Sequence, residues 1–258
     1  MPRPIITLLT DFGLRDHYVA AMKGVILGIC PEACLVDISH EIEAFNIQQA
    51  AWTLAQACEC FPPGTVHLVV VDPGVGSGRR PLAAQAGSHF FVGPDNGVLA
   101  GILDSHSNPS VYQITAPKYF RHPVSTTFHG RDIFAPIAAH LATGLDIAQV
   151  GDPVAEYVRL ATTAGTVVSV DRFGNIVTNL HGESFRWIAE QPFEMHLGSH
   201  VITAFAENYS DARENEYFVT IGSAGFLEVS LNRRSAAESL DVKPGMTVLV
   251  RHPDAGTA

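Results

Sequence analysis

The chain has 258 residues, of which 47% are hydrophobic and 16% are charged, and its formal net charge is −10 at pH 7. This composition supplies apolar surface for one large or two modest packed domains and excludes a disordered chain. The negative charge, with no run of Lys and Arg, argues against nucleic-acid and anionic-membrane partners, because both need clustered positive side chains.

The first half of the chain alternates between strand and helix patterns. Apolar runs predict strands at 6–10, 34–39, 65–71 and 111–115, and a short strand followed by a turn at 89–99. Apolar residues spaced by three and four predict helices at 16–30, 46–61 and 131–144. Pro136 fits only the first turn of a helix, so the last helix is expected to begin a little after residue 131. The alternation predicts a layered α/β domain with a largely parallel sheet.

The pattern changes after about residue 155. Short β-rich runs at 166–180, 192–207, 216–232 and 245–253 are separated by Gly, Asn and Asp, and only 184–191 and 235–240 have helical character. These runs predict a smaller, β-barrel-like C-terminal domain. The turn-forming cluster Gly151-Asp152-Pro153 marks the expected boundary, which divides the chain into domains of residues 1–153 and 154–258.

The cysteines and the N-terminal segment indicate the cellular compartment. Cys30, Cys34, Cys58 and Cys60 do not have the two-pair spacing of a structural zinc site, so free thiols are expected. The segment MPRPIITLLTDFG lacks the basic and apolar pattern of a signal peptide, and no apolar run of about 18 residues exists for a membrane span. A cytoplasmic protein with reduced thiols is therefore expected.

Three polar clusters follow predicted strands or precede a predicted helix: TDFG (10–13), DPGVGSGRR (72–80) and STTFHGRD (125–132). Open α/β sheets bind ligands at the carboxyl ends of their strands. Asp11 and Asp72 each come directly after an apolar strand, so they are expected at equivalent strand ends. Either aspartate has an ordinary interpretation as a turn-forming residue. The functional interpretation of Asp11 is a carboxylate that accepts both hydroxyls of a ribose.

The glycines of the 72–80 loop give it the freedom to fold back and return Arg79 to Asp72. An arginine keeps the carboxylate ionised, and the pair offers a water molecule an acceptor and a positive field. Phosphate binding is the alternative, but the loop lacks the P-loop lysine and does not match G-x-G-x-x-G. His129 is by itself typical of a packed, hydrogen-bonded residue, and it matters only if it converges with these two. Asp132 has ligand spacing from His129, but no third ligand is evident, so no metal is expected.

Polar residues also follow strands in the second half. DRFGN (171–175) places Asp171 and Asn175 in a tight turn, for which a hairpin is the ordinary interpretation. Ser223 lies at a strand break and Tyr209 in a polar loop. Together they offer a carboxylate for an ammonium group, a hydroxyl for an amino-acid head group and an aromatic ring for a purine face.

The combination of TDFG, VVDPGVG…RR and FHGRDIFAP resembles the S-adenosyl-L-methionine (SAM) hydroxide adenosyltransferases, the adenosine-forming SAM hydrolases related to fluorinase and chlorinase. The resemblance covers nearly the whole chain. It implies an α/β N-terminal domain, a β-barrel-like C-terminal domain and a homotrimer with active sites at subunit interfaces. It also implies SAM as the substrate, with no metal or other cofactor.

The motifs of the resemblance match the water-activating triad of that family to Asp72, Arg79 and His129. Substrate contacts are implied for Asp11 (ribose), Phe45 (an aromatic ring near the substrate), Phe128 (beside the reacting centre), Asp171 and Ser223 (methionine head group), Asn175 and Tyr209 (adenine), and Asn232.

The sequence departs from the halogenating relatives at positions that matter for chemistry. The resemblance places Asp72 where those enzymes have Tyr, Val75 where they have Thr and Gly130 where they have Ser. A carboxylate at position 72 repels a halide. Ala224 stands where the fluorinase has an Arg near the methionine carboxylate.

The resemblance thus implies in-line attack of water or hydroxide on the ribose 5′ carbon of SAM, which yields adenosine and methionine. A halide-using adenosyltransferase and a non-catalytic SAM- or adenosine-binding protein are the alternatives.

Overall fold

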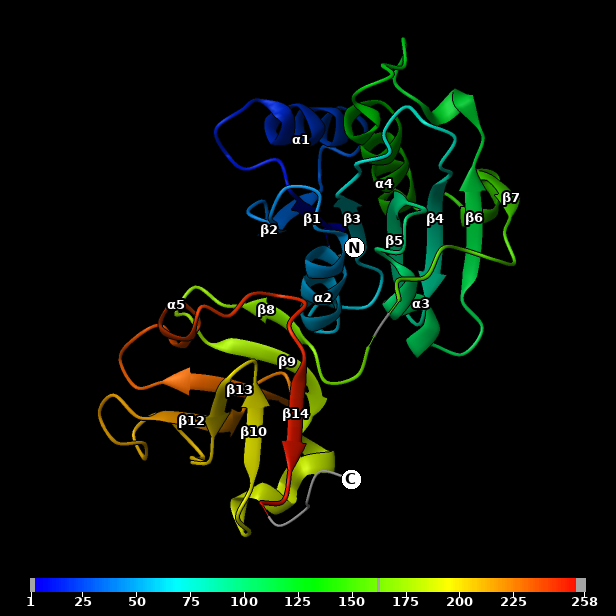
Figure 1. Ribbon diagram of the computed structural model, residues 1–258. Coiled ribbons are helices and arrows are strands. Elements are labelled where there is room, and N and C mark those ends of the chain that lie inside the picture. Colours follow the sequence, from blue (N-terminus) through cyan, green and yellow to red (C-terminus); the bar gives the residue numbers. More distant parts are fainter. Residues whose placement is uncertain (1–2, 162, 254–258) are drawn as a thin grey trace. The chain divides into compact units, whose positions relative to one another are not determined.

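The structure is a computed structural model that describes residues 3–161 and 163–253 (Figure 1). The chain divides into two compact units, Met1–Leu160 and Ala161–Ala258. Within the described residues, none of the helices combines the length and the apolar character that a membrane crossing requires.

The N-terminal unit contains a seven-stranded sheet in the order β2-β1-β3-β5-β4-β6-β7. The strands β2, β1, β3 and β5 are parallel, and β4, β6 and β7 extend the sheet as antiparallel strands. The predicted α/β architecture is confirmed. The strands are β1 (Ile5–Thr10), β2 (Cys34–Ser39), β3 (Val66–Val70), β4 (Pro81–Ala86), β5 (His89–Pro94), β6 (Ser110–Ile114) and β7 (Gly151–Pro153).

Strand β4 was not among the sequence predictions. Its residues, PLAAQA, include no β-branched or aromatic side chain, and therefore carry little local strand signal. Hydrogen bonding to β5 and β6 on its two sides makes it a strand. The cluster Gly151-Asp152-Pro153 forms β7, which pairs with β6.

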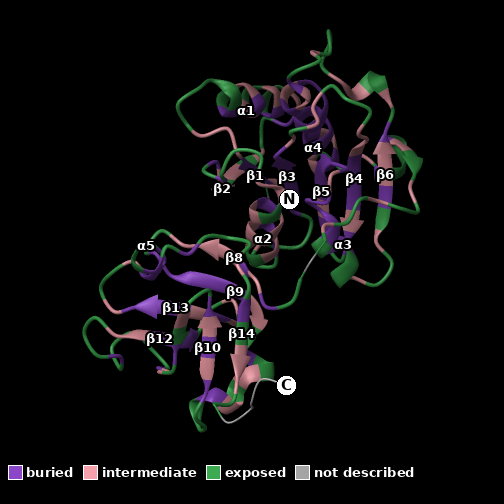
Figure 2. Cartoon of the chain, viewed as in Figure 1, coloured by how far each residue is buried: buried purple, intermediate pink, exposed green. Residues whose placement is uncertain are grey.

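Helices cover both faces of this sheet. Helix α1 packs with α4 in one buried cluster, and α2 packs with α3 in a second cluster against the other face (Figure 2). The predicted helix at 131–144 is in fact a π-helical turn followed by α4, with Pro136 in the first turn of α4. The helical elements are α1 (Tyr18–Ile29), α2 (Ile47–Cys58), α3 (Ala100–Ser105), α4 (Ala135–Ala142), the π-turn η2 (Gly130–Phe134) and the 3₁₀ turns η1 (Pro117–Tyr119) and η3 (Ile147–Gln149).

The C-terminal unit is rich in antiparallel strands, as predicted. They form a four-stranded sheet, β12-β13-β9-β8, and a three-stranded sheet, β11-β10-β14, so a single closed barrel is not confirmed. A buried cluster that includes Met195, Val219 and Leu227 forms the core. The elements are β8 (Val167–Val170), β9 (Ile176–His181), η4 (Gly182–Ala189), β10 (Glu194–Leu197), β11 (His200–Ile202), β12 (Tyr217–Ile221), β13 (Phe226–Leu231), α5 (Ala236–Leu240) and β14 (Val248–Arg251).

A fully buried histidine lies near the start of β3. His67 Nδ1 lies 2.8 Å from Thr7 Oγ1, and the ring stacks on Phe91 with centroids 5.1 Å apart. Its Nε2 atom has no hydrogen-bond partner among the described residues. Burial, with a smaller contribution from neighbouring His89, lowers the pKa of His67 to about 3. The fold therefore requires a neutral ring at this position.

Acid is expected to destabilise the N-terminal unit through His67. The unfolded chain binds a proton here below about pH 6.5, whereas the folded protein resists protonation until about pH 3. The free energy of unfolding should therefore fall by about 5 kcal/mol as the pH drops between these values. Urea unfolding as a function of pH measures this slope. The double variant Thr7→Val/His67→Phe should show a shallower slope, and an identical slope in both proteins would contradict the assignment.

Candidate active site

The carboxyl ends of β1 and β3 bring two aspartates to one edge of the sheet. Thr10 pairs with Val70 in the parallel register, and Asp11 and Asp72 follow these strands. Asp11 Oδ2 accepts the backbone N–H of Phe45 at 2.9 Å. Phe45 has a left-handed backbone, with φ of 69°, and its side chain is 69% exposed. Asp11 thus connects two loops and retains acceptor capacity for a ligand hydroxyl.

Asp72 and Arg79 form a buried ion pair. Arg79 Nε donates to Asp72 Oδ1 at 2.9 Å, and Nη2 donates to Oδ2. The two side chains are only 4% and 10% exposed. A Cβ on Gly74 would lie 3.2 Å from Arg79 Cγ, so the glycine leaves room for the arginine to cross the loop. A bidentate pair of this kind fixes the orientation of the carboxylate.

His129 joins the pair through the same guanidinium group. Arg79 Nη2 lies 2.9 Å from His129 Nδ1. Because a guanidinium has only donors, Nδ1 is the acceptor and the ring proton is on Nε2. Burial first, and then the charge of Arg79, lower the pKa of His129. The structure therefore brings the three predicted triad residues together, with a neutral imidazole whose Nε2–H is the remaining donor.

The segment before α4 is anchored by a buried carboxylate. Asp132 is fully buried and accepts hydrogen bonds from Arg121, from Arg131 and from the backbone N–H of Ser125. These partners lower its pKa against the opposing effect of burial. Asp132 thus positions the His129 segment, and within residues 3–161 and 163–253 no three potential ligand side chains are grouped for a metal ion.

The two loops of the triad meet at a glycine. Gly76 has φ of 76°, and a Cβ there would lie 2.3 Å from the carbonyl oxygen of Thr126. Only glycine permits both this backbone conformation and this approach. Contact between the loops at Gly76 therefore brings the segments that carry Arg79 and His129 together.

The second arginine of the motif has a different role. Arg80 Nε donates to Asp95 Oδ2 at 2.8 Å, and its Nη2 donates to the carbonyl oxygen of Glu156 at 2.7 Å. Asp95 also accepts the backbone N–H of Val158 at 2.8 Å. Arg80 thus fastens the segment around residues 156–158, which weakens the alternative that both arginines clamp a phosphate.

Sequence reasoning missed a polar network behind Asp11. Thr10 Oγ1 lies 2.8 Å from His40 Nδ1, and His40 Nε2 lies 3.0 Å from Asp37 Oδ1. Lys23 Nζ donates to Asp37 at 2.6 Å. The backbone of His40 also accepts the N–H of Gly13 at 2.7 Å. The buried His40 therefore supports the TDFG turn, and only the alternation of polar residues in and after β2 hinted at it.

Removing the His40 side chain is expected to act through Asp11. If Asp11 binds a ribose, as the sequence predicts, the variant His40→Ala should raise KM for that substrate about tenfold and leave kcat within about threefold, because the contact that orients the turn is lost. His40→Asn keeps a polar atom near Thr10 and should recover most of the affinity. Steady-state kinetics of both variants check this, and a fall in kcat with unchanged KM would exclude the positioning role.

The C-terminal unit brings three predicted residues together. Asp171 Oδ1 accepts the backbone N–H groups of Phe173 and Asn175 at 2.9 and 2.8 Å, and Oδ2 accepts Asn175 Nδ2 at 2.8 Å. Asn175 Nδ2 also lies 3.2 Å from the Tyr209 hydroxyl. The Tyr209 ring packs edge-on against Phe218. Asp171 therefore organises its own turn, and the half-exposed Tyr209 remains accessible.

The remaining predicted contact residues include Ser223, Asn232 and Phe128. Ser223 is exposed in the Gly222–Gly225 turn. Asn232 Nδ2 donates to the carbonyl oxygen of Ala212 at 2.8 Å. Phe128 is 7% exposed and belongs to the core cluster of the α1–α4 layer, where Arg131 stacks on its ring.

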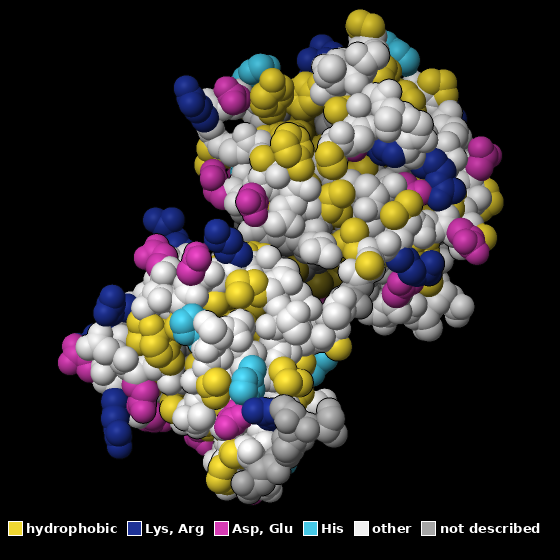
Figure 3. Space-filling view, in the orientation of Figure 1, with side chains coloured by type: hydrophobic (Ala, Val, Ile, Leu, Met, Phe, Trp, Pro, Cys, Tyr) yellow, Lys and Arg dark blue, Asp and Glu magenta, His cyan; other side chains and the backbone are white. Residues whose placement is uncertain are grey.

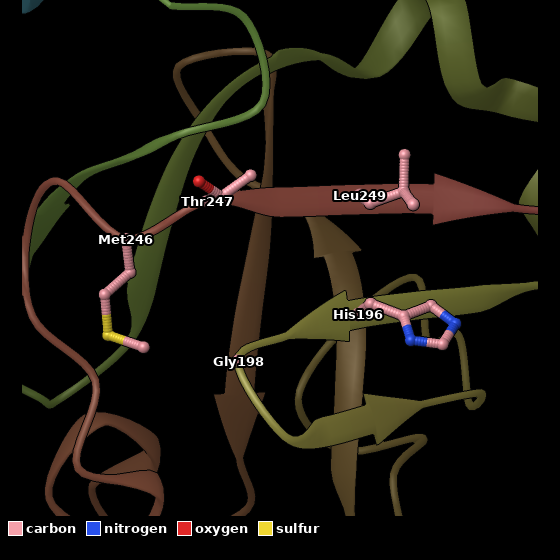
Figure 4. Close-up of a pocket in the computed structure, with 5 residues that line it drawn as sticks. All are labelled: His196, Gly198, Met246, Thr247 and Leu249. Carbon is pink, nitrogen blue, oxygen red and sulfur yellow. The ribbon is translucent and has the colours of Figure 1, made fainter.

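The molecular surface gives little further information about the predicted active site. On the face shown in Figure 3, Lys and Arg side chains are scattered among Asp and Glu side chains. An open hollow of about 290 Å³ lies on the three-stranded sheet of the C-terminal unit (Figure 4). None of the predicted site residues lines it; its lining residues are His196, Gly198, Met246, Thr247 and Leu249.

Known proteins are similar to this chain in sequence and in fold. Residues 6–151 match the SAM hydroxide adenosyltransferase N-terminal domain, and residues 165–249 match the C-terminal domain. An (R)-S-adenosyl-L-methionine hydrolase of Thermus thermophilus is 38% identical, and the alignment covers 95% of this chain and 98% of the relative. A crystal structure of an uncharacterized conserved protein from Thermotoga maritima has a TM-score of 0.91 at 38% identity, covering 95% of this chain and all of that chain.

A fluorinase of Nocardia brasiliensis is more distant, at 27% identity over 96% of this chain and 97% of the relative. The two domain matches and the full-length relatives agree in order and extent. The chain belongs to the SAM hydroxide adenosyltransferase family.

Proposed function

We propose that this protein hydrolyses SAM to adenosine and L-methionine. The cluster of Asp72, Arg79 and His129 at a strand end carries the proposal, because Arg79 bonds both of the others and so an acceptor, a positive charge and a donor belong to one hydrogen-bonded group. Relatives that are 35–38% identical are named (R)-S-adenosyl-L-methionine hydrolase.

The proposed reaction is an in-line displacement at the ribose 5′ carbon. The water oxygen forms the new C–O bond while the C–S bond breaks, and the electron pair of that bond stays on sulfur. Methionine leaves as a neutral thioether, so the leaving group needs no general acid and no metal. We therefore propose that no cofactor takes part. The demanding step is to hold and polarise the water opposite sulfur, and positioning alone contributes several kcal/mol.

The hydrogen bonds support different roles for the three residues of the triad. His129 Nδ1 is occupied by Arg79, and Nε2 carries a proton, so the neutral ring is a donor toward the water. Arg79 holds the carboxylate of Asp72 in place and stabilises hydroxide character. Asp72 is the only one of the three with lone pairs available to accept the proton of the water, which then passes to solvent.

The site favours water over halide. A carboxylate at Asp72 repels an anion. A Cβ on Gly130 would lie 3.2 to 3.3 Å from Met22, Phe128 and Val70, so the serine of halogenating relatives would need its neighbours to shift. Both features support hydrolysis over halide transfer.

Assembly and location are further parts of the proposal. We propose a homotrimer in which each site pairs the N-terminal domain (1–153) of one subunit with the C-terminal domain (154–258) of its neighbour. The exposed side chains of Phe45 and Phe173, 69% and 79% accessible, support contacts beyond a single chain. A cytoplasmic location is supported by four free cysteines.

One chromatographic assay tests the function. Purified protein is incubated with SAM, with the (R) and (S) epimers at sulfur assayed separately, and products are separated by liquid chromatography. Adenosine and methionine in equal amounts are expected. A 5′-halo-adenosine formed in the presence of chloride or fluoride would show the halide-using alternative. Binding of SAM without any product would show a non-catalytic protein.

A further inference from the structure

Glu228 carries a carboxylate that has no partner among residues 3–161 and 163–253. It lies in the middle of β13, opposite Thr220 on β12 and Val177 on β9. Its side chain is half-buried. Among the described residues, no hydrogen bond or ion pair reaches its carboxylate. A half-buried carboxylate loses part of its hydration, and without a compensating donor this loss costs stability, whereas its oxygens stay accessible to a ligand.

The carboxylate lies beside the turn that carries Ser223. A Cβ on Gly222 would lie 1.8 Å from Glu228 Oε1, so the carboxylate occupies the space that a side chain at position 222 would need. Gly222 begins the turn, with its N–H donating to the carbonyl oxygen of Phe226 and its carbonyl oxygen accepting the N–H of Gly225. The carboxylate of Glu228 thus lies against the backbone of Gly222, next to Ser223.

The negative charge of Asp171 also acts on the carboxylate of Glu228. Burial, and then the negative charge of Asp171, raise the pKa of Glu228. Burial raises the pKa of Tyr209, and the charges of Glu228 and Asp171 add smaller contributions in the same direction. Glu228 is therefore placed among Asp171, Tyr209 and the Ser223 turn, in a region of negative potential that favours a cation.

We propose that Glu228 binds the α-ammonium group of the methionine part of SAM, an inference that rests on the proposed function. Asp171 already accepts three hydrogen bonds within its own turn. Glu228 accepts no hydrogen bond from the part of the chain that the structure describes. An ammonium group brings a positive charge and three donors, which would compensate both the desolvation of Glu228 and its repulsion by Asp171. Ala224 offers no side-chain cation to compete for it.

A structural role and a ligand-binding role for Glu228 predict opposite effects of its neutralisation on the stability of the protein. If the carboxylate held the fold, its neutralisation would lower the melting temperature. If it is an uncompensated charge kept for a ligand, the isosteric variant Glu228→Gln should melt at or above the wild-type temperature, because a partly desolvated charge is removed without a change of shape.

The test compares two ligands that differ in the head group. Glu228→Gln is assayed for KM with SAM and for the inhibition constant of adenosine, which lacks the methionine part. We expect KM to rise at least about tenfold, as for the loss of a charge-assisted hydrogen bond, while the inhibition constant of adenosine stays within about twofold. Glu190→Gln, an exposed glutamate in the same unit, is the matched control and should change neither value.

The outcomes separate this inference from the proposed function. If the wild-type protein releases no adenosine from SAM, the proposed function fails and the assignment of Glu228 fails with it. If the wild-type protein cleaves SAM and Glu228→Gln leaves KM unchanged, only the assignment of Glu228 is overturned. Equal weakening of SAM and adenosine, or a lower melting temperature, would show a general distortion and would also overturn it.

Discussion

The variant Asp72→Ala is expected to lower kcat by about 100-fold or more while KM for SAM changes by less than about threefold. Asp72 is the acceptor of the triad, and loss of acid–base assistance usually costs at least two orders of magnitude. The substrate is held by other groups, so its affinity should persist. Release of adenosine under saturating SAM measures the effect.

The matched control for this variant removes another Asp–Arg pair. Asp104 accepts two hydrogen bonds from Arg159, at 2.8 and 2.9 Å, in the same bidentate geometry, but its side chain is 42% exposed. Asp104→Ala should leave kcat unchanged, because the pair lies outside the triad. The role of Asp72 in activating water would be wrong if Asp72→Ala kept kcat within about threefold of the wild type.

The variant Gly76→Ala is expected to lower kcat by one to two orders of magnitude and to reduce the free energy of unfolding by about 1 to 3 kcal/mol. The new methyl group would lie 2.3 Å from the carbonyl oxygen of Thr126, so the two loops must separate. Arg79 and His129 lie on opposite sides of this contact, and a misplacement of about 1 Å in an active site is enough to cost about 100-fold in rate.

Substitutions at two other glycines distinguish backbone strain from the clash with Thr126 as the cause of the lower kcat. Gly64 has φ of 85° and open space around its Cβ position, so Gly64→Ala introduces backbone strain alone. Gly78 lies in the same loop as Gly76, with open space and without a positive φ, so Gly78→Ala should be nearly neutral. Kinetics and thermal melting of the three variants give the comparison. Equal activity in Gly76→Ala and Gly78→Ala would show that the contact with Thr126 does not position the triad.

Local features of the sequence were sufficient to predict much of the architecture. Apolar runs ending in Asp11 and Asp72 predicted two strand ends carrying carboxylates, because strand burial and turn chemistry depend on neighbouring residues. The glycine-rich loop predicted the return of Arg79 toward Asp72, seven residues away in the sequence, and the ion pair is present. The change to short β-rich runs predicted the second unit for the same reason.

Other features depended on contacts between distant segments. Strand β4 has little strand propensity of its own and is defined by hydrogen bonds to its neighbours. The two adjacent arginines could not be told apart in the sequence, yet Arg79 pairs with Asp72 and Arg80 with Asp95. Only the positions of these partners in the folded sheet decide the difference.

The sequence by itself determined where strands end, which loops bend and which residue types carry chemistry, because those properties arise from short stretches of chain. Only the tertiary structure decided the protonation of His129, the support of Asp11 by His40 and the lack of a partner for Glu228 among the described residues. Each of these depends on burial and on a partner, or its absence, across the fold. Burial and long-range pairing are set by packing of the whole unit, and no local pattern encodes them.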